Sequence, residues 1–416
     1  MSNFLDPKII GQNKFCAAPF TSVYIGQYNE IRVCCASPTA IGNLDENKTL
    51  EEIINSNTAQ DIRNNLINNT FHSACKHCAG IESNTGKIAN ERYDNNRLGL
   101  PTINDAVLNT DTNGFIHSQK PVWLDILYSN KCNFACMGCS ADLSSTIASK
   151  YASAYNILHG KPAYTESVKE WQNDNDKIID YILQHKDTIQ TLHINGGEPF
   201  MQEPVHELLD VLLKNGLNKT IRIWSHTNGS ISKYKSVDVI EQYLTNWGKK
   251  AIITLSHDLH GERGEYIRYG LKQDKWKHTY NRLKSANVEI NIQTCYNVFN
   301  ALHMQELYDF YRYELDFDNH LVLGQWSEPV TFSARILQTN KDLFEKANNI
   351  LDSMQYKKND FAWAYKMHSI KKFLNYTIPS DKIEIYKKRF TQSIEKFDHL
   401  RGTSFMQTFP ELQSLI

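Results

Sequence analysis

The spacing of apolar and polar positions predicts strands that alternate with helices over the middle of the chain. The clearest helical pattern spans residues 204–217, with Val205, Leu208 and Leu212 on one face and Gly216 as a stop signal. Such alternation favours parallel β/α units in an open sheet or an incomplete barrel, with chemistry at the carboxyl ends of the strands. The predicted strands cover residues 122–129, 188–195, 220–227, 251–257, 288–298 and 320–326.

The two ends of the chain have different patterns. Near the N-terminus, short strand-like runs precede a helical stretch at 50–65, and the polar segment that follows, up to about residue 119, is expected to be a surface linker. The chain after residue 331 is mostly helical in pattern. Its basic and aromatic stretch at 371–390 favours helices with a solvated basic face over a nucleic-acid contact. These changes predict three domains, 1–118, 119–330 and 331–416.

Composition narrows the class of protein. The chain has 416 residues, of which 41% are hydrophobic and 22% charged, as is typical of a globular protein with a sizeable core. Its formal net charge of −1 supplies no basic field for nucleic acid. The N-terminus lacks a signal-peptide pattern, and no apolar run approaches the ~20 residues that span a bilayer, so a cytoplasmic location without membrane contact is expected.

The nine cysteines point to metal binding. Eight of them fall into two groups, one before residue 80 and one at 132–139, and such grouping in a reducing compartment indicates metal ligands rather than disulfides. Cys295 stands alone and is expected to be a small buried apolar residue.

The stretch KCNFACMGC contains the spacing Cys132-x3-Cys136-x2-Cys139, directly after the first strand of the alternating region. A [4Fe–4S] cube normally takes four thiolates, so three thiolates from one loop would leave one iron open to another ligand. A structural zinc site is the alternative, although no fourth cysteine or histidine lies at pair spacing nearby.

This cysteine stretch resembles the cluster motif of the radical S-adenosylmethionine (radical SAM) enzymes. The resemblance implies an α/β fold with a partial (β/α)6 barrel of the TIM type. It also implies S-adenosylmethionine on the open iron, reductive cleavage to a 5′-deoxyadenosyl radical, and a reductant such as flavodoxin or ferredoxin. Many relatives carry an aromatic residue just before the last cysteine, where this chain has Gly138.

Other strand ends resemble cofactor-binding segments of the same family. GGEP, after the second strand, resembles the methionine-binding segment, and SHD with the later YIRYG resembles the segments that meet the ribose and the cofactor carboxylate. Ordinary turns and strand-end caps are the alternative for each. The cofactor-binding residues implied by the resemblance are Gly196, Gly197, Glu198, Ser256 and Arg268.

The N-terminal cysteines resemble those of a twitch domain, a shortened SPASM domain that binds an auxiliary iron–sulfur cluster. The matching order is a cysteine, a hairpin, a cysteine, IGNL with a following helix, and CKHC. The resemblance implies Cys16, Cys34, Cys75 and Cys78 as ligands, with Cys34 preferred to Cys35 by its spacing from the hairpin, and a zinc site remains the alternative. In many relatives this domain follows the barrel, whereas here it precedes it.

Relatives with such domains often modify peptides or proteins, so a peptide or protein substrate is expected. The same radical chemistry on a small molecule or a nucleotide is one alternative. A non-catalytic iron–sulfur or zinc protein is the other.

Overall fold

The computed structural model describes residues 13–85, 90–160, 172–318, 321–326, 329–358 and 360–416. The chain forms two compact units. The first comprises Met1–Ser129, Trp171–Ser225 and Val237–Ile252, and the second comprises Asn130–Glu170, His226–Ser236 and Ile253–Ile416. Strands β7 (Arg222–Thr227) and β10 (Ala251–Ser256) each begin in the first unit and end in the second.

The first unit contains a mixed sheet in the order β7-β6-β4-β1-β2-β3. The pairs β1–β4, β4–β6 and β6–β7 are parallel, while β2 runs antiparallel to β1 and β3. Leu124, Ile126 and Leu192 are fully buried, as expected of a parallel sheet that is covered on both faces. The other strands of this unit are β1 (Ser22–Ile25), β2 (Glu30–Arg32), β3 (Gly42–Asn43), β4 (Trp123–Leu127), β6 (Thr191–Asn195) and β9 (Val237–Asp238).

The predicted helix at 50–65 is two helices, α2 (Leu50–Ile54) and α3 (Asn57–Ile67). The break occurs because Ser56 caps a new helix, its hydroxyl accepting the backbone N–H of Ala59. The other helices of this unit are α1 (Ala18–Thr21), α7 (Asn175–Gln184), α8 (Glu203–Lys214) and α9 (Thr245–Trp247).

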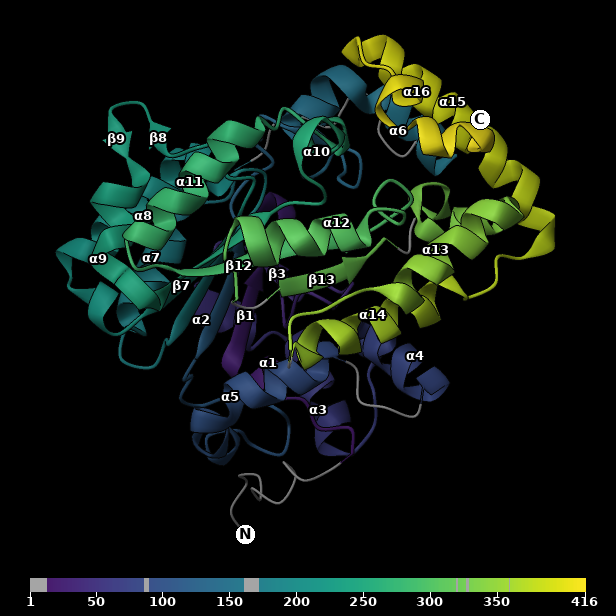
Figure 1. Cartoon of the computed structure of the whole chain (residues 1–416). Coiled ribbons are helices and arrows are strands. Elements are labelled where there is room, and N and C mark those ends of the chain that lie inside the picture. The colour runs from purple at the N-terminus through teal and green to yellow at the C-terminus, as the bar shows by residue number, and fades with distance from the viewer. Residues whose placement is uncertain (1–12, 86–89, 161–171, 319–320, 327–328, 359) are drawn as a thin grey trace. The chain divides into compact units, whose positions relative to one another are not determined.

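The segment predicted to be a polar linker is helical instead. It contains α4 (Lys76–Thr85) and α5 (Asn90–Leu108), and Figure 1 shows α5 beside α1. Ile103, Ala106 and Val107 of α5 belong to a core cluster with Phe15 and Phe20. The linker prediction was wrong because this contact uses a few apolar residues near one end of α5, too few to give a period over the whole segment.

The second unit contains the strands β13-β12-β10 in that order, with β12 (Glu289–Tyr296) parallel to β13 (Leu321–Gln325). A separate pair is formed by β5 (Ala135–Cys136) and β11 (Arg268–Tyr269). All six predicted strands are therefore present, and the α/β class is confirmed. The other elements are β8 (Lys233–Tyr234), α6 (Ala152–His159), α10 (Gly261–Ile267), α11 (Gln273–Ser285) and α12 (Met304–Asp309).

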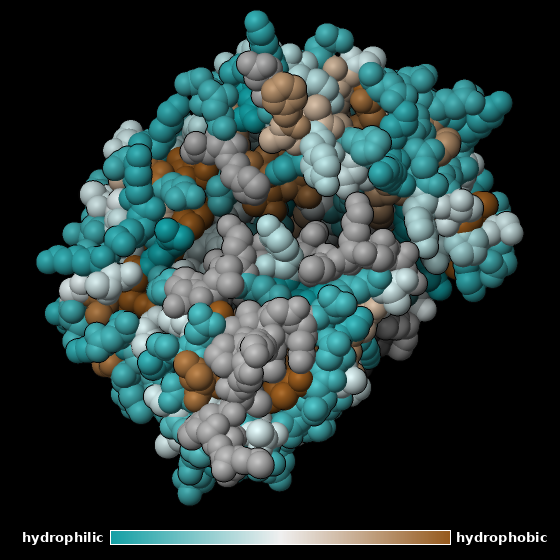
Figure 2. Space-filling model, turned by 90° about the horizontal axis from the view of Figure 1, so that it is seen from below, coloured by the Kyte–Doolittle hydropathy of each residue, from teal (hydrophilic) through white to brown (hydrophobic). Residues whose placement is uncertain are grey.

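The C-terminal part of the second unit is helical, as predicted. It contains α13 (Lys341–Ser353), α14 (Phe361–Leu374), α15 (Ile383–Arg401) and α16 (Phe405–Thr408). Helix α15 packs against α6, and both lie together in Figure 1. No helix in the described part of the chain has the length and apolar character needed to cross a bilayer. On the face in Figure 2, hydrophobic residues gather in separate patches among hydrophilic ones. The three-domain division stays a prediction.

Candidate metal centres and active site

The cluster loop, residues 132–139, is fixed by hydrogen bonds from its own C-terminal flank. The Thr146 hydroxyl donates to the Cys132 carbonyl at 2.6 Å, and the Ser144 hydroxyl donates to the Phe134 carbonyl at 2.6 Å. From α6, the Tyr155 hydroxyl donates to the Cys136 carbonyl. These bonds satisfy carbonyls that a partly buried loop would otherwise leave without protein donors, and they hold the cysteine backbone in one conformation.

Arg268 lies directly beside the middle cysteine. The β5–β11 pair sets Arg268 opposite Cys136, and the Met137 N–H donates to the Ile267 carbonyl at 2.8 Å. One guanidinium nitrogen of Arg268 is 3.9 Å from Cys136 Sγ, and its Nε is 2.9 Å from Asp258 Oδ2. Although burial opposes the charged form, Asp258 raises the pKa of Arg268 above its usual value, so the guanidinium stays charged.

Two thiols of the loop, those of Cys136 and Cys139, are protonated when no metal is bound. Burial raises the pKa of Cys139 to about 12 and also raises the pKa of Cys136, although the charges of Arg268 and Arg401 oppose the shift at Cys136. A metal that binds them must displace these protons. The soft thiol donors and the adjacent guanidinium, which offsets thiolate charge, fit an iron–sulfur cluster.

Among the described residues, no group of three Cys, His, Asp or Glu side chains is arranged around a single metal ion. A cluster does not require that arrangement, because each thiolate binds a different iron.

Asp258 connects several residues behind the loop. Its Oδ1 accepts the Cys295 N–H at 2.8 Å, and its carbonyl accepts from the Asn300 amide at 3.0 Å. Cys295 is half-buried and lies close enough to Asp258, Arg268 and Trp326 for each to influence its pKa, which burial raises to about 12. Cys295 is therefore a neighbour of the Asp258–Arg268 pair and not an isolated core residue. The sequence did not indicate this position, because Cys295 lies 156 positions after Cys139.

Trp326 fills the space next to Gly138. A Cβ atom on Gly138 would lie 1.8 Å from Cζ2 and 2.1 Å from Cε2 of the indole. The backbone of Gly138 is not in the left-handed region, so the indole, not the backbone conformation, requires a glycine here. An aromatic ring therefore lies against the residue before the last cysteine, but it comes from the residue that follows β13.

Ser256 and two further polar residues of the second unit, Asn228 and His257, lie at strand ends. Ser256 is the half-buried last residue of β10. Asn228, which follows β7, donates its side-chain amide to Asn133 Oδ1 in the cluster loop at 2.9 Å. His257, which follows β10, is fully buried and bonds to the Tyr311 hydroxyl at 2.9 Å.

The GGEP segment belongs to the first unit. Gly196 and Gly197 have φ values of 96° and 49°, which disfavour other residues. A Cβ on Gly196 would also lie 2.6 Å from the Ser129 carbonyl oxygen. Glu198 is fully buried, so a carboxylate lies at the C-terminal end of β6 as predicted.

Four cysteines of the first unit line one small cavity, and Cys35 is exposed outside it. Burial raises the pKa of Cys34 and of Cys75 to about 11, and it raises that of Cys16 further. Neighbouring thiols add to the shift at Cys16, so these sulfurs lie within electrostatic reach of one another. The four cysteines are Cys16, Cys34, Cys75 and Cys78.

Arg92 and His77 also line this cavity. Arg92 forms a bidentate pair with Glu82, with both N–O distances at 2.6 Å, and donates to the Phe15 carbonyl at 2.8 Å. The Phe15 bond links α5 to the residue before Cys16. The thiol-rich, enclosed donor set fits a closed metal centre.

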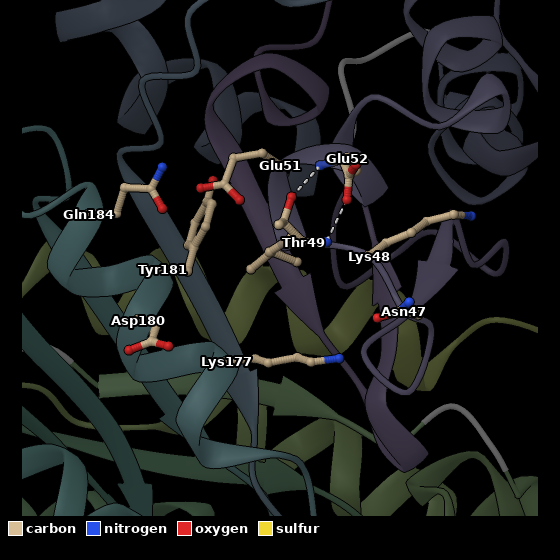
Figure 3. Close-up of a pocket in the computed structure, with 10 residues that line it drawn as sticks. Asn47, Lys48, Thr49, Glu51, Glu52, Lys177, Asp180, Tyr181 and Gln184 are labelled. Atoms are coloured by element: carbon tan, nitrogen blue, oxygen red, sulfur yellow. Dashed lines mark hydrogen bonds between the residues drawn. The ribbon is translucent and has the colours of Figure 1, made fainter.

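A separate surface hollow of about 410 Å³ lies beside α2 and α7 (Figure 3). Its polar groups serve the fold: Thr49 and Glu52 form a capping box at the start of α2, and Lys177 donates to the Leu44 and Glu46 carbonyls. It has no cysteine in its lining and belongs to neither cysteine site.

Comparison with known proteins identifies both cysteine-bearing segments. Residues 16–79 match the SPASM domain, an iron-sulfur cluster-binding domain, and residues 124–245 match Fer4_12, a 4Fe-4S single cluster domain. No curated protein matches the chain. Each cysteine group thus lies in a segment similar to an iron–sulfur domain, and the predicted SPASM-type pattern of the N-terminal cysteines is confirmed.

Several solved structures are similar to parts of the chain. Native anSMEcpe with bound AdoMet is 20% identical over 56% of this chain and 60% of that chain, with a TM-score of 0.38. Streptococcus suis SuiB bound to precursor peptide SuiA is 15% identical over 71% and 56%, with a TM-score of 0.37. TYW1 with a lysine-pyruvate adduct is 16% identical over 54% and 71%, with a TM-score of 0.31. The chain spans 60% of the first of these proteins.

Proposed function

We propose that this protein is a radical SAM enzyme in which Cys132, Cys136 and Cys139 bind a [4Fe–4S] cluster. The cluster loop carries the proposal: it presents three cysteines within eight residues, its backbone is held by flanking hydroxyls, and a guanidinium lies 3.9 Å from Cys136 Sγ. When bound, the cluster and S-adenosylmethionine supply reductive cleavage of the cofactor to a 5′-deoxyadenosyl radical.

The residues proposed to hold S-adenosylmethionine have distinct roles. The positive φ values of Gly196 and Gly197 open the backbone at the end of β6, and Glu198 supplies a buried carboxyl group that could accept hydrogen bonds from an ammonium group. Arg268 already uses its Nε edge for Asp258, so only its outer nitrogens are available to a carboxylate. Ser256 is the proposed ribose contact.

Cys16, Cys34, Cys75 and Cys78 are the proposed ligands of an auxiliary iron–sulfur cluster. Four thiolates would complete its ligand set, so this centre would bind no substrate directly. The position of the four cysteines around one cavity, with Cys35 outside, supports this choice.

A peptide or protein is the proposed substrate, because the auxiliary domain is of the SPASM type. A flavodoxin or ferredoxin is the proposed reductant. A cytoplasmic location, in which thiols stay reduced, is part of the same proposal.

Oxygen-free reconstitution tests the proposal. We expect the loaded protein to release 5′-deoxyadenosine from S-adenosylmethionine when dithionite is added. Cys136→Ala should abolish this release yet keep the absorbance of the auxiliary cluster, and Cys35→Ala, a matched cysteine substitution outside both sites, should leave it unchanged. Zinc at the cluster loop, or release by Cys136→Ala, would refute the assignment.

The substrate class needs a second assay. Peptide, nucleoside and metabolite pools should be offered separately, and the peptide pool is expected to increase the release of 5′-deoxyadenosine. An increase with nucleosides alone would instead favour nucleotide modification.

A further inference from the structure

The last residue of α15, Arg401, extends into the cluster loop from the opposite end of the sequence. It is 7% exposed, and its guanidinium donates to the Ala135 carbonyl at 2.6 Å and lies 3.4 Å from Met137 Sδ. These two residues flank Cys136. A single side chain therefore contacts the loop on both sides of its middle cysteine.

Aromatic rings surround this guanidinium. It lies over Phe397 at 4.3 Å, Tyr269 at 5.0 Å and Tyr151 at 5.5 Å from the ring centroids. Such contacts stabilise a cation, most strongly where water is excluded. The Tyr269 hydroxyl also donates to the Arg401 carbonyl at 3.2 Å, which ties the end of α15 to β11.

The charge of Arg401 has no carboxylate partner within 4.0 Å among the described residues, and its Nε has no hydrogen-bond partner there. Asp398, one turn earlier on α15, accepts instead from Tyr266, Thr403 and the Phe405 N–H. A buried cation without a counter-charge is costly to maintain. Arg268, in contrast, is neutralised by Asp258.

We propose that Arg401 is a positioning residue of the cluster loop, and that the anionic thiolate cluster supplies its missing counter-charge. The guanidinium holds the Ala135–Met137 backbone in the ligating conformation. Its charge favours the reduced cluster, which carries one more negative charge than the oxidised cluster, and so raises the reduction potential. This inference rests on the proposed cluster at Cys132, Cys136 and Cys139.

Redox titration of the reconstituted full-length protein, followed by electron paramagnetic resonance, tests the inference. The signal of the cluster loop is the one absent from Cys136→Ala. Arg401→Gln should lower the equilibrium constant for reduction at least tenfold, which equals ~59 mV for one electron. Arg401→Lys keeps the charge but not the planar guanidinium contacts. It should therefore retain the potential while binding less iron in the loop.

Arg335→Gln is the matched control. Arg335 is also a buried arginine that lies over two aromatic rings, Phe373 and Tyr376, and its substitution should leave the potential unchanged. An unchanged potential in loaded Arg401→Gln would overturn the inference. If Arg401→Gln does not fold, Arg401→Lys decides, because full iron content in its loop would equally overturn the positioning role. A wild-type loop cluster that forms but does not cleave S-adenosylmethionine would refute only the proposed function.

Discussion

Replacing Gly138 by alanine tests whether the Trp326 indole determines the residue before the last cysteine of the loop. The new Cβ would lie 1.8, 2.1 and 2.6 Å from three atoms of the ring. Real Cβ contacts do not occur below 3.0 Å, so the indole or the loop must move. Overpacking of this kind costs about 1–3 kcal/mol of folding stability.

Removal of the Trp326 indole should turn the destabilising effect of Gly138→Ala on folding into a stabilising one. In a Trp326→Ala background, Gly138→Ala meets no indole and restricts only the unfolded chain, which stabilises a protein by about 0.4–1 kcal/mol. The difference between the two backgrounds is a coupling energy of about 1.4–4 kcal/mol, which largely overlaps the range of about 0.5–3 kcal/mol found for residues in contact. Gly80→Ala is the control, because its Cβ would meet no atom within 4 Å.

Urea unfolding of the metal-free variants measures these free energies, and iron content after reconstitution shows whether the loop still binds its cluster. We expect Gly138→Ala to lose stability and loop iron together, and the double variant to regain both. Equal effects of Gly138→Ala in the two backgrounds would show that the indole does not constrain this position.

Three further predictions concern other parts of the chain. Cys34→Ala should lose the auxiliary cluster while Cys35→Ala keeps it, as measured by iron and sulfide per chain, since only Cys34 lines the four-cysteine cavity. Arg63→Met should lower the free energy of unfolding by about 3–5 kcal/mol, as measured in urea, because it leaves buried carbonyls without a donor. The fully buried Arg63 guanidinium donates to the carbonyls of Gly114, Pro19 and Ile54. A loss below about 1 kcal/mol would contradict this role. Burial lowers the pKa of His257 to about 3 in the folded protein. In the unfolded chain His257 has its ordinary pKa of about 6.5, so the unfolded chain takes up the proton first as the pH falls. Stability should therefore fall by about 2 kcal/mol between pH 7 and pH 5, and His257→Gln should remove that part of the slope.

The sequence predicted those parts of the fold that depend on local patterns. The six strands were found because each is a short apolar run between polar turns. The cluster loop was found because its three cysteines lie within eight residues, and the N-terminal cysteines because the order of their motifs resembles that of a twitch domain. Helix α5 was missed because its contacts with the core depend on Phe15 and Phe20, far earlier in the chain. Local periodicity carries no information about such a partner.

The residues that surround the cluster loop could not be predicted from the three-cysteine motif, because they lie far from it in the sequence. The three cysteines lie within eight residues, but Arg268 belongs to β11, Trp326 follows β13, and Arg401 ends α15. Each acts on the loop through a different physical property: paired charge, ring volume and unpaired charge. The C-terminal helices, which had no assigned role at the sequence level, therefore contribute to the loop through Arg401. A truncation that removes α15 should accordingly disturb the loop cluster even though every cysteine is retained, and the four-cysteine site of the first unit serves as the internal control.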